Sequence, residues 1–326
     1  MLIVSLGSTA GLRAADEELR SSLERAGASV ALVQAAPPRE ARTLMLTDFL
    51  WARAARAAVC AWLERARAGA VIYSTTTAAL FSPRPGVIRF DACAAANRPG
   101  HHGLWQRPLE RKRLAAAPLL LPWSEQGLTE TPTLMAVSAR ANTLALPVPV
   151  DPSGPPEPTR DIAAITYAAN PAKKGLDRVL NAWQRVRAPG QELVVAGAEL
   201  ELVQEGVRIA GALPREQYRA LLRRSRVFIS AARREDYGIA QLEALADGCM
   251  LVSTPAPGPY AALPIARELD ARLVSDDLGA ALEVALGNPV PGYAARAHAA
   301  MAQFSRDTVD RRVVEELLPR LRQISA

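Results

Sequence analysis

The sequence is poor in lysine, cysteine and aromatic residues, and it has no long apolar run. Lysine occurs only at positions 112, 173 and 174, so the other 36 of the 39 basic residues are arginine. The three cysteines lie far apart and form no CxxC pair, which argues against a disulfide framework or a zinc site and favours a reducing cytoplasm. No stretch approaches the roughly 18–20 apolar residues of a membrane span, and the N-terminus lacks the basic region of a signal peptide. We therefore expect a soluble, cytoplasmic protein.

Length and charge narrow the class of protein further. A chain of 326 residues exceeds the usual size of one hydrophobic core, so two domains are expected. Hydrophobic residues make up 49% and aromatic residues only 5%, which implies a core built mainly of alanine, leucine and valine. The net charge of +6 is spread along the chain without a recognition motif, so nucleic acid is not an expected partner.

The first 75 residues alternate apolar runs, typical of buried strands, with stretches of helical spacing. Gly27 follows the first helical stretch, as a C-terminal cap would. A strand, a glycine-containing turn, a helix and a second strand make one βαβ step of a parallel sheet. The strands are expected at 2–6, 29–34 and 70–75, and the helices at 12–26 and 48–69.

A proline-rich stretch, residues 148–160, is typical of a linker between two domains. The alternation resumes after it, so we expect two Rossmann-like, doubly wound α/β domains, at 1–147 and 161–305, followed by a helix, 306–326, that could cross back to the first domain. Open parallel sheets bind ligands at the carboxyl ends of their strands, and the expected site is an interdomain cleft. In the second half, strands are expected at 162–168, 192–197, 207–211, 227–230 and 250–254, and helices at 175–186, at 214–225, from near 237, and from 293 to 324.

The stretch "REDYGIAQLEALADG" places two acids, Glu235 and Glu243, eight residues apart around the start of a helix. Free N–H groups at Gly238 and Ile239 would seat a phosphate, and Gly238 would let a ligand approach the backbone. Eight helical residues span about 12 Å, which suits an extended nucleotide diphosphate sugar held at both ends by carboxylates. In the alternative interpretation Asp236 is an N-cap, Glu235 complements the helix dipole and Glu243 is exposed.

Two further stretches follow predicted strands. "NPAKKGLDRVLNAW" contains two of the three lysines beside Gly175, and a lysine there suits a diphosphate whose negative charge grows as a bond breaks. The alternative is a solvated surface turn. "GSTAGLR", residues 7–13, follows the first strand, and its backbone N–H groups would cradle an anion or only make a tight turn.

In order and spacing, these motifs resemble the retaining glycosyltransferases of family 4, which have the GT-B fold. "EDYGIAQLEALADGCMLVST" resembles the family signature E-G-F-G-x-x-x-x-E-A-x-A-x-G-x-P-V-V-A, and "KKGLDRVLNAW" resembles E-K-G-x-D-x-L-x-x-A-x. "AGLRAADEELRSSLERAGASV", "VPVDPSGPPEP" and "GALPREQYRALLRRSRVFIS" resemble the family's first loop and helix, its linker, and a stretch of its second domain. The resemblance covers the second domain throughout and the first domain in parts.

The resemblance implies a hexosyltransferase that moves a sugar from a nucleotide diphosphate sugar to an acceptor hydroxyl with retention of configuration. Glu235 would hold the sugar hydroxyls near the reacting carbon, Glu243 the ribose, and Lys174 the diphosphate. The remaining donor-binding positions implied are Arg13, Gly11 and the backbone at Tyr237, Gly238, Ile239 and Ala240. The acceptor, a small molecule, a glycan or a lipid-linked molecule, would bind the first domain, and neither a metal nor another cofactor is required.

The sequence departs from the family pattern at two places. Ala169 stands where the family has an arginine that clamps phosphate, and the candidate replacements, in order, are Arg13, Arg233 and Arg234. Phe90 stands where the family often has a histidine, which leaves Asp91 to orient the acceptor. His101 and His102 are then candidates for a base or for acceptor contacts, although a histidine pair beside glycine is more often only solvated.

Rival interpretations remain open at this stage. Ala169 and Phe90 also fit a catalytically degenerate subunit that binds nucleotide or a partner without turnover, and a sugar-nucleotide epimerase or phosphorylase is a weaker rival. The basic stretch 105–113 suits peripheral contact with the inner face of a membrane, whereas Glu110 within it favours an ordinary polar helix face. The sequence does not set the donor base, the sugar, the acceptor or the oligomeric state.

Overall fold

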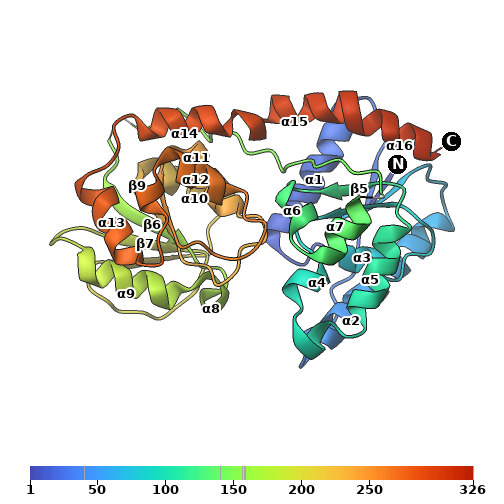
Figure 1. Ribbon diagram of the computed structural model, residues 1–326, viewed down its shortest axis with the longest axis horizontal. Coiled ribbons are helices and arrows are strands. Elements are labelled where there is room, and N and C mark those ends of the chain that lie inside the picture. The colour runs from blue at the N-terminus through green and yellow to red at the C-terminus, as the bar shows by residue number, and fades with distance from the viewer. Residues whose placement is uncertain (40, 140, 156, 158, 326) are drawn as a thin grey trace. The chain divides into compact units, whose positions relative to one another are not determined.

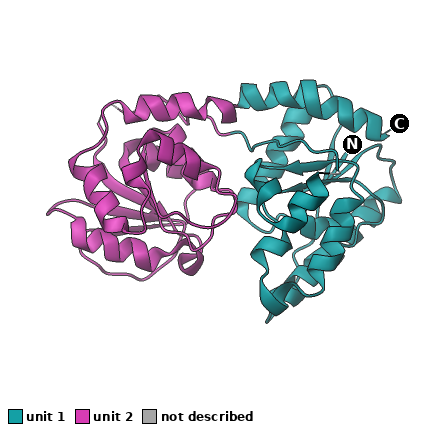
Figure 2. Cartoon of the chain, viewed as in Figure 1, with its two compact units in different colours: residues 1–149, 306–326 teal, residues 150–305 magenta. Residues whose placement is uncertain are grey.

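The computed structural model divides the chain into two compact units (Figure 1). Unit 1 comprises residues 1–149 and 306–326, and unit 2 comprises residues 150–305 (Figure 2). The residues that the structure describes are 1–39, 41–139, 141–155, 157 and 159–325.

Unit 1 is built on a sheet of five parallel strands in the order β2-β1-β3-β4-β5. Leu2 and Val4 of β1 belong to one buried apolar cluster and Ile3 to another, so both faces of the sheet are covered, as the unbroken apolar run predicts. The strands are β1 (Leu2–Ser5), β2 (Ala31–Gln34), β3 (Val71–Tyr73), β4 (Val87–Phe90) and β5 (Leu120–Pro122). The helices are α1 (Ala10–Arg25), α2 (Leu44–Leu63), α3 (Thr76–Ala79), α4 (Ala94–Asn97), the 3₁₀ turn η1 (Gly100–Gly103), α5 (Gln106–Ala115), α6 (Gln126–Thr129) and α7 (Pro132–Ser138).

The C-terminal helical segment belongs to unit 1 rather than to unit 2. It consists of α15 (Arg306–Arg312), the π-helical segment η4 (Val313–Leu317) and α16 (Leu318–Ser325). Its apolar side chains pack in the same buried cluster as Ile3 and α1 of unit 1; they are Val309, Val313, Leu317 and Leu321. An ion pair of 2.7 Å between Arg25 and Asp310 adds to this contact.

A buried ion pair links α1 to the sheet of unit 1. The guanidinium of Arg89, on β4, lies 3.1 Å from Asp16, and both side chains are almost completely buried. The guanidinium also lies over the ring of Trp123, 4.8 Å from its centroid. Burial raises the pKa of Asp16, although the neighbouring Arg89 opposes the shift. Each charge therefore depends on the other to remain ionised in the core.

Unit 2 is built on a second sheet of five parallel strands, in the order β10-β9-β6-β7-β8. The strands are β6 (Ile162–Tyr167), β7 (Leu193–Ala196), β8 (Val207–Gly211), β9 (Ser225–Ser230) and β10 (Met250–Ser253). The helices are α8 (Pro171–Lys174), α9 (Leu176–Val186), α10 (Arg215–Arg224), α11 (Ile239–Ala246), α12 (Ala262–Leu269), α13 (Leu278–Gly287) and α14 (Tyr293–Met301), with 3₁₀ turns η2 (Ala271–Leu273) and η3 (Ala302–Phe304).

The strand orders locate the ligand-binding edges. In unit 2 the chain places β7 and β8 on one side of β6 and β9 and β10 on the other, so the order reverses between β6 and β9. In unit 1 the corresponding reversal lies between β1 and β3. Ligands of doubly wound sheets bind outside the carboxyl ends of the two strands that flank such a reversal. The segments after β6 and β9, and those after β1 and β3, are therefore the places to seek a site.

Several element boundaries differ from the sequence-based expectations. The helix expected near Tyr237 begins at Ile239, because Gly238 is its N-cap in a left-handed conformation, with φ of 89°. The loop expected at 7–11 is shorter, because Thr9 caps α1 by accepting from the N–H of Leu12 at 3.2 Å. The helix expected at 48–69 is α2, which starts four residues earlier and ends at Leu63. In the described part of the chain, no helix is long and apolar enough to span a membrane.

Candidate functional site

Two of the predicted site residues, Lys174 and Glu235, form an ion pair at the point of strand reversal in unit 2. Lys174 ends α8 after β6, and Glu235 follows β9. Lys174 Nζ lies 2.7 Å from Glu235 Oε2. The Glu235 side chain is only 9% exposed and that of Lys174 is 27% exposed, so the carboxylate is largely buried and the ammonium stays partly accessible to solvent. A charged pair at this edge can neutralise an anion and accept from hydroxyl groups at the same place.

Two glycines fix the backbone on either side of this pair. Gly175 has φ of 64°, and a Cβ there would lie 2.1 Å from the carbonyl oxygen of Ala231. Gly258 has φ of 116°, and a Cβ there would lie 2.2 Å from the carbonyl oxygen of Glu235. The Glu235 N–H also donates to the carbonyl of Pro257 at 3.0 Å. Only glycine fits such positions. The close packing of three loops therefore fixes the backbone from which the side chains of Lys174 and Glu235 extend.

The N-terminus of α11 lies directly after Glu235. Gly238 is the N-cap, and Ile239 and Ala240 occupy the first helical turn, where backbone N–H groups lack partners within the helix. Such N–H groups and the positive end of the helix dipole favour a phosphate. Tyr237 is buried, so its side chain is part of the support beneath this turn. The alternative in which Asp236 caps the helix is wrong, because Gly238 is the N-cap and no described side chain caps this terminus; Asp236 instead pairs with Arg234 at 2.7 Å.

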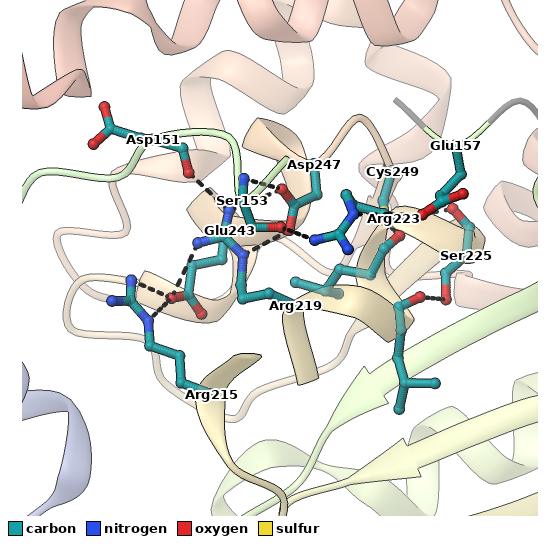
Figure 3. A network of polar contacts seen from close by, with 12 residues as sticks. Asp151, Ser153, Glu157, Arg215, Arg219, Arg223, Ser225, Glu243, Asp247 and Cys249 are labelled. Carbon is teal, nitrogen blue, oxygen red and sulfur yellow. Dashed lines mark hydrogen bonds and ion pairs between the residues drawn. The ribbon is translucent and has the colours of Figure 1, made fainter. Parts of the chain in front are cut away.

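Glu243 lies at the end of a buried network that Figure 3 shows. Arg215 donates to Glu243 Oε1 through Nε at 3.0 Å and Nη2 at 2.9 Å, and Arg219 Nη1 lies 3.6 Å from the same oxygen. Glu243 is 6% exposed, so the alternative in which it is exposed is wrong. Tyr167, the last residue of β6, has its pKa raised by burial and by the nearby charge of Glu243. Glu243 therefore lies near the same strand end that leads to Lys174.

Arg219 ties this network to the start of unit 2. It contacts Asp247 with two hydrogen bonds of 2.6 and 2.9 Å and donates to the carbonyl of Asp151 at 2.8 Å (Figure 3). Asp247 in turn accepts from the N–H of Ser153 at 2.8 Å. Burial alone would lower the pKa of Arg219, but the carboxylates of Asp247 and Glu243 raise it overall. Glu243 therefore lies between two cations, the exposed Arg215, which donates to it, and the buried Arg219, which is itself paired with Asp247.

The candidate replacements for the arginine missing at Ala169 lie in two different units. Arg233 pairs with Asp177 at 3.0 Å, and its N–H donates to the carbonyl of Lys173 at 3.0 Å. Arg234 precedes Glu235 in the chain and pairs with Asp236. Arg13 lies in unit 1, where it donates to the carbonyl of Gly7 at 2.7 Å. The order of preference among the three stays a prediction.

The other predicted residues lie in unit 1. Gly11 is in the first turn of α1, after β1, and Asp91 follows β4, with Oδ1 accepting from the N–H of Ala92 at 2.8 Å. Phe90 is completely buried, so it fills the core instead of facing a ligand. His101 and His102 lie together in η1, with ring centroids 4.2 Å apart. Their roles in acceptor binding or catalysis stay predictions.

The interpretation of Glu110 as a marker of a solvated helix face is wrong. Glu110 is 3% exposed, and its carboxylate accepts from the N–H groups of Ala94 at 2.8 Å and Ala95 at 3.4 Å, at the start of α4. The exposed residues of α5 include Arg111 and Lys112, which line an open pocket of approximately 790 Å³ between α5 and α7. Contact between this basic face and a membrane stays a prediction.

Burial raises the pKa of Glu110 above its ordinary value of 4.5, and this shift predicts how the free energy of unfolding depends on pH. As pH rises from about 4.5, the unfolded chain releases the proton while the folded protein retains it, so the free energy of unfolding falls until the raised pKa is passed. Glu110→Gln is neutral throughout. We therefore expect it to gain stability relative to wild type between pH 5 and pH 8, by about 1.4 kcal/mol for each unit of pKa shift. Urea unfolding at both pH values measures this, with Glu125→Gln, on an exposed acid, as the control. An unchanged difference at the two pH values would contradict the prediction.

Among the residues that the structure describes, no three His, Cys, Asp or Glu side chains gather closely enough to bind a metal ion. The need for a metal or other cofactor was not tested by this geometry and stays as predicted from the resemblance.

Several residues that shape the site were missed by sequence analysis. They are Arg215, Arg219, Gln241, Gly258 and Tyr260. Gly258 stands in the proline- and glycine-containing loop "PAPGPY" after β10, which is a signal of a tight turn at the ligand edge. Gln241 was visible as a polar residue on the apolar helix between Glu235 and Glu243. Nothing in the local sequence distinguishes Arg215 and Arg219 from the other arginines, because the chain contains 36 of them.

The chain is similar to known proteins in part of its sequence and in its fold. Residues 160–286 match the family model described as glycosyl transferases group 1. No curated protein sequence matches the chain significantly. Among solved structures, a sucrose-phosphate synthase from Thermosynechococcus elongatus is similar with a TM-score of 0.67 and 14% identity, over 99% of this chain and 98% of that one.

Two other similar structures have the same coverage, 99% of this chain and 98% of theirs. WaaG, a glycosyltransferase involved in lipopolysaccharide biosynthesis, has a TM-score of 0.63 and 14% identity. A trehalose-6-phosphate protein from E. coli, bound with UDP-2-fluoro glucose, has a TM-score of 0.67 and 12% identity. The resemblance inferred from the motifs is confirmed. The chain has the GT-B fold, and its residues 160–286 are similar to the glycosyl transferases group 1 family.

Proposed function

We propose that the protein is a retaining glycosyltransferase that moves a hexose from a nucleotide diphosphate sugar to an acceptor hydroxyl. The observation that carries this proposal is the Lys174–Glu235 pair, 2.7 Å apart, at the strand reversal of unit 2 and directly before the N-terminus of α11. A cation, a recessed carboxylate and a row of helical N–H groups suit the three parts of such a donor that lie nearest the reaction.

Each group would have a distinct task. The N–H groups at Gly238–Ala240 would hold the diphosphate, and Lys174 would offset the charge that grows on it as the bond to the sugar breaks. Glu235 would accept hydrogen bonds from sugar hydroxyls and so place the reacting carbon. Arg215 and Arg219 contact Oε1 of Glu243, so its Oε2 would accept from ribose hydroxyls. Catalysis would come from positioning and stabilisation of the leaving group, not from a covalent nucleophile.

The acceptor would bind to unit 1. The segment after β4 carries Asp91. Asp91 would orient an acceptor hydroxyl, with His101 or His102 as a second polar contact. A small molecule, a glycan and a lipid-linked acceptor all remain candidates.

The first experiment is a thermal-shift panel of UDP, GDP, ADP and dTDP sugars. UDP sugars come first because the similar E. coli structure was solved with UDP-2-fluoro glucose. One donor is expected to stabilise the protein, by about 2.7 kcal/mol at one hundred times its Kd. With that donor, wild type is expected to hydrolyse or transfer the sugar, and Glu235→Ala is not. The anomeric proton signals of the product then report retention. No stabilisation by any of the four classes would refute the donor site.

A second candidate function is a nucleotide-binding subunit without turnover. Ala169 and the buried Phe90 favour it, since each replaces a polar residue of the family pattern. Stabilisation by a sugar nucleotide, combined with equal absence of product from wild type and Glu235→Ala, would support this candidate over the enzyme. An epimerised sugar nucleotide formed without acceptor would instead support an epimerase.

A further inference from the structure

The carboxylate of Glu235 has a second hydrogen-bond donor besides Lys174. Gln241, on α11, donates through Nε2 to Glu235 Oε2 at 2.9 Å, on the same oxygen that Lys174 contacts at 2.7 Å. Gln241 is 3% exposed, whereas the Lys174 side chain is 27% exposed. One carboxylate oxygen is therefore held by two donors, a partly exposed ammonium and a buried amide.

The orientation of the Gln241 amide follows from its partners. A carboxylate can only accept hydrogen bonds, so the NH₂ group and not the carbonyl must face Glu235. The same nitrogen donates to Ser230 Oγ at 2.9 Å, at the end of β9. Tyr260, which is fully buried, places its hydroxyl 3.4 Å from Ser230 Oγ and 3.0 Å from Ser253 Oγ. This chain of polar contacts leaves the amide little freedom to turn away from Glu235.

The two donors would respond differently to a bound nucleotide sugar. An incoming diphosphate attracts Lys174 and draws its charge away from Glu235. Gln241 is neutral and enclosed, so it keeps its contact with Oε2. The other oxygen, Oε1, then accepts from the sugar without rotation of the carboxyl group.

We propose that Gln241 is a positioning residue that keeps the Glu235 carboxylate aligned with the donor sugar after Lys174 turns to the diphosphate. The proposal rests on the proposed function, because it assigns Glu235 to the sugar. It goes beyond that function in giving the alignment to a buried glutamine that touches no substrate. Three titratable or charged side chains lie around the Gln241 amide. They are Glu235, Lys174 on the far side of the Glu235 carboxylate, and Tyr260.

Gln241→Leu removes the amide while keeping a side chain of similar length on α11. We expect kcat to fall about tenfold to a hundredfold, the range seen when the outer partner of a site residue is lost, while the donor KM changes by less than about threefold. Gln184→Leu is the matched control. Gln184 also donates from its amide, to the carbonyl of Glu205 at 2.9 Å, but it lies on α9 away from the pair. Its kcat is expected to stay within about twofold of wild type.

Gln241→Glu separates a positioning role from a purely structural one. At pH 8 two carboxylates would face each other, and kcat is expected to be at least as low as in Gln241→Leu. As pH falls toward about 6, the introduced acid takes up a proton, because two adjacent carboxylates share one, and its O–H can then donate to Glu235 Oε2. The ratio of its kcat to that of wild type at the same pH is therefore expected to rise about fivefold or more. A structural glutamine would give a ratio that does not depend on pH.

Three results would overturn the proposal. Two are kinetic: a kcat of Gln241→Leu within threefold of wild type, and a flat pH ratio for Gln241→Glu. The third needs no turnover at all: in a crystal structure of Gln241→Leu with the stabilising nucleoside diphosphate bound, the Glu235 carboxylate is expected to be displaced from its place in wild type with the same ligand, and an unmoved carboxylate contradicts the proposal. Failure of the proposed function itself is a different outcome, in which wild type turns over no sugar nucleotide although Glu235 moves in the variant.

Discussion

Lys174→Met is expected to lower kcat about a hundredfold to a thousandfold with the donor that stabilises the protein most. Removal of a single group that stabilises developing negative charge typically costs this much. Two losses combine here. The diphosphate loses the cation that offsets its charge on leaving, and Glu235, whose side chain is 9% exposed, loses its counter-charge. The measurement is initial rate against donor concentration, with kcat and KM separated.

The sequence supplies a matched control for this change. Lys173 is the neighbouring residue and one of only three lysines, but it is exposed. Lys173→Met removes the same charge from the same turn, and its kcat is expected to stay within about threefold of wild type. Equal losses in the two variants would mean that the turn acts only through its net charge, and the ion pair with Glu235 would have no special part in turnover.

Asp16→Leu is expected to lower the free energy of unfolding of unit 1 by about 3–5 kcal/mol. The substitution leaves the Arg89 guanidinium buried without the carboxylate that lies 3.1 Å away. Desolvation of that charge is no longer offset, and the stacking on Trp123 contributes far less than the ion pair. Because a domain is stable by only about 5–15 kcal/mol, much of the variant would unfold under mild denaturation.

A double variant distinguishes loss of the pair from loss of packing. Asp16→Leu combined with Arg89→Met replaces both charges by apolar groups, and its stability is expected to lie within about 1–2 kcal/mol of wild type. Tryptophan fluorescence in urea follows unit 1, which contains Trp51, Trp62, Trp105 and Trp123, whereas unit 2 contains Trp183. A double variant as unstable as the single one would show that the apolar replacements, and not the stranded charge, cause the damage.

The parts of the fold that sequence analysis predicted well are those with a local cause. The strand 207–211 has the predicted bounds, and β6 and β10 differ from prediction by one residue, because continuous apolar runs between glycines and polar turns leave little choice of register. Lys174 and Glu235 lie together because each follows a strand that flanks the reversal, and that both face one ligand stays a prediction. Motif spacing encodes such placements directly.

The errors concern burial and partners at long range. The sequence places Glu110 in a basic stretch and so favours a polar helix face, yet its carboxylate accepts from the backbone at the start of α4 and is buried. Arg215 was not foreseen as a partner of Glu243, which is 28 residues away. The contact of Gln241 with Glu235 depends on the turn at Gly238, whose left-handed conformation shifts the start of α11 by two residues. Such relations depend on how elements pack, and no local pattern of side chains specifies them.

The inclusion of residues 306–325 in unit 1 has a consequence for synthesis on the ribosome. The segment completes the cluster around Ile3 and α1, yet it is translated only after the whole of unit 2. At about 5–20 residues per second, translation of unit 2 takes on the order of ten seconds. Throughout that interval the nascent first unit exposes the apolar surface that α15 and α16 later cover. Unit 2, in contrast, is one continuous segment of the chain, so all of its core residues emerge together. Unit 2 can therefore finish folding first, and the unfinished first unit is the part of the newborn chain that needs protection from aggregation.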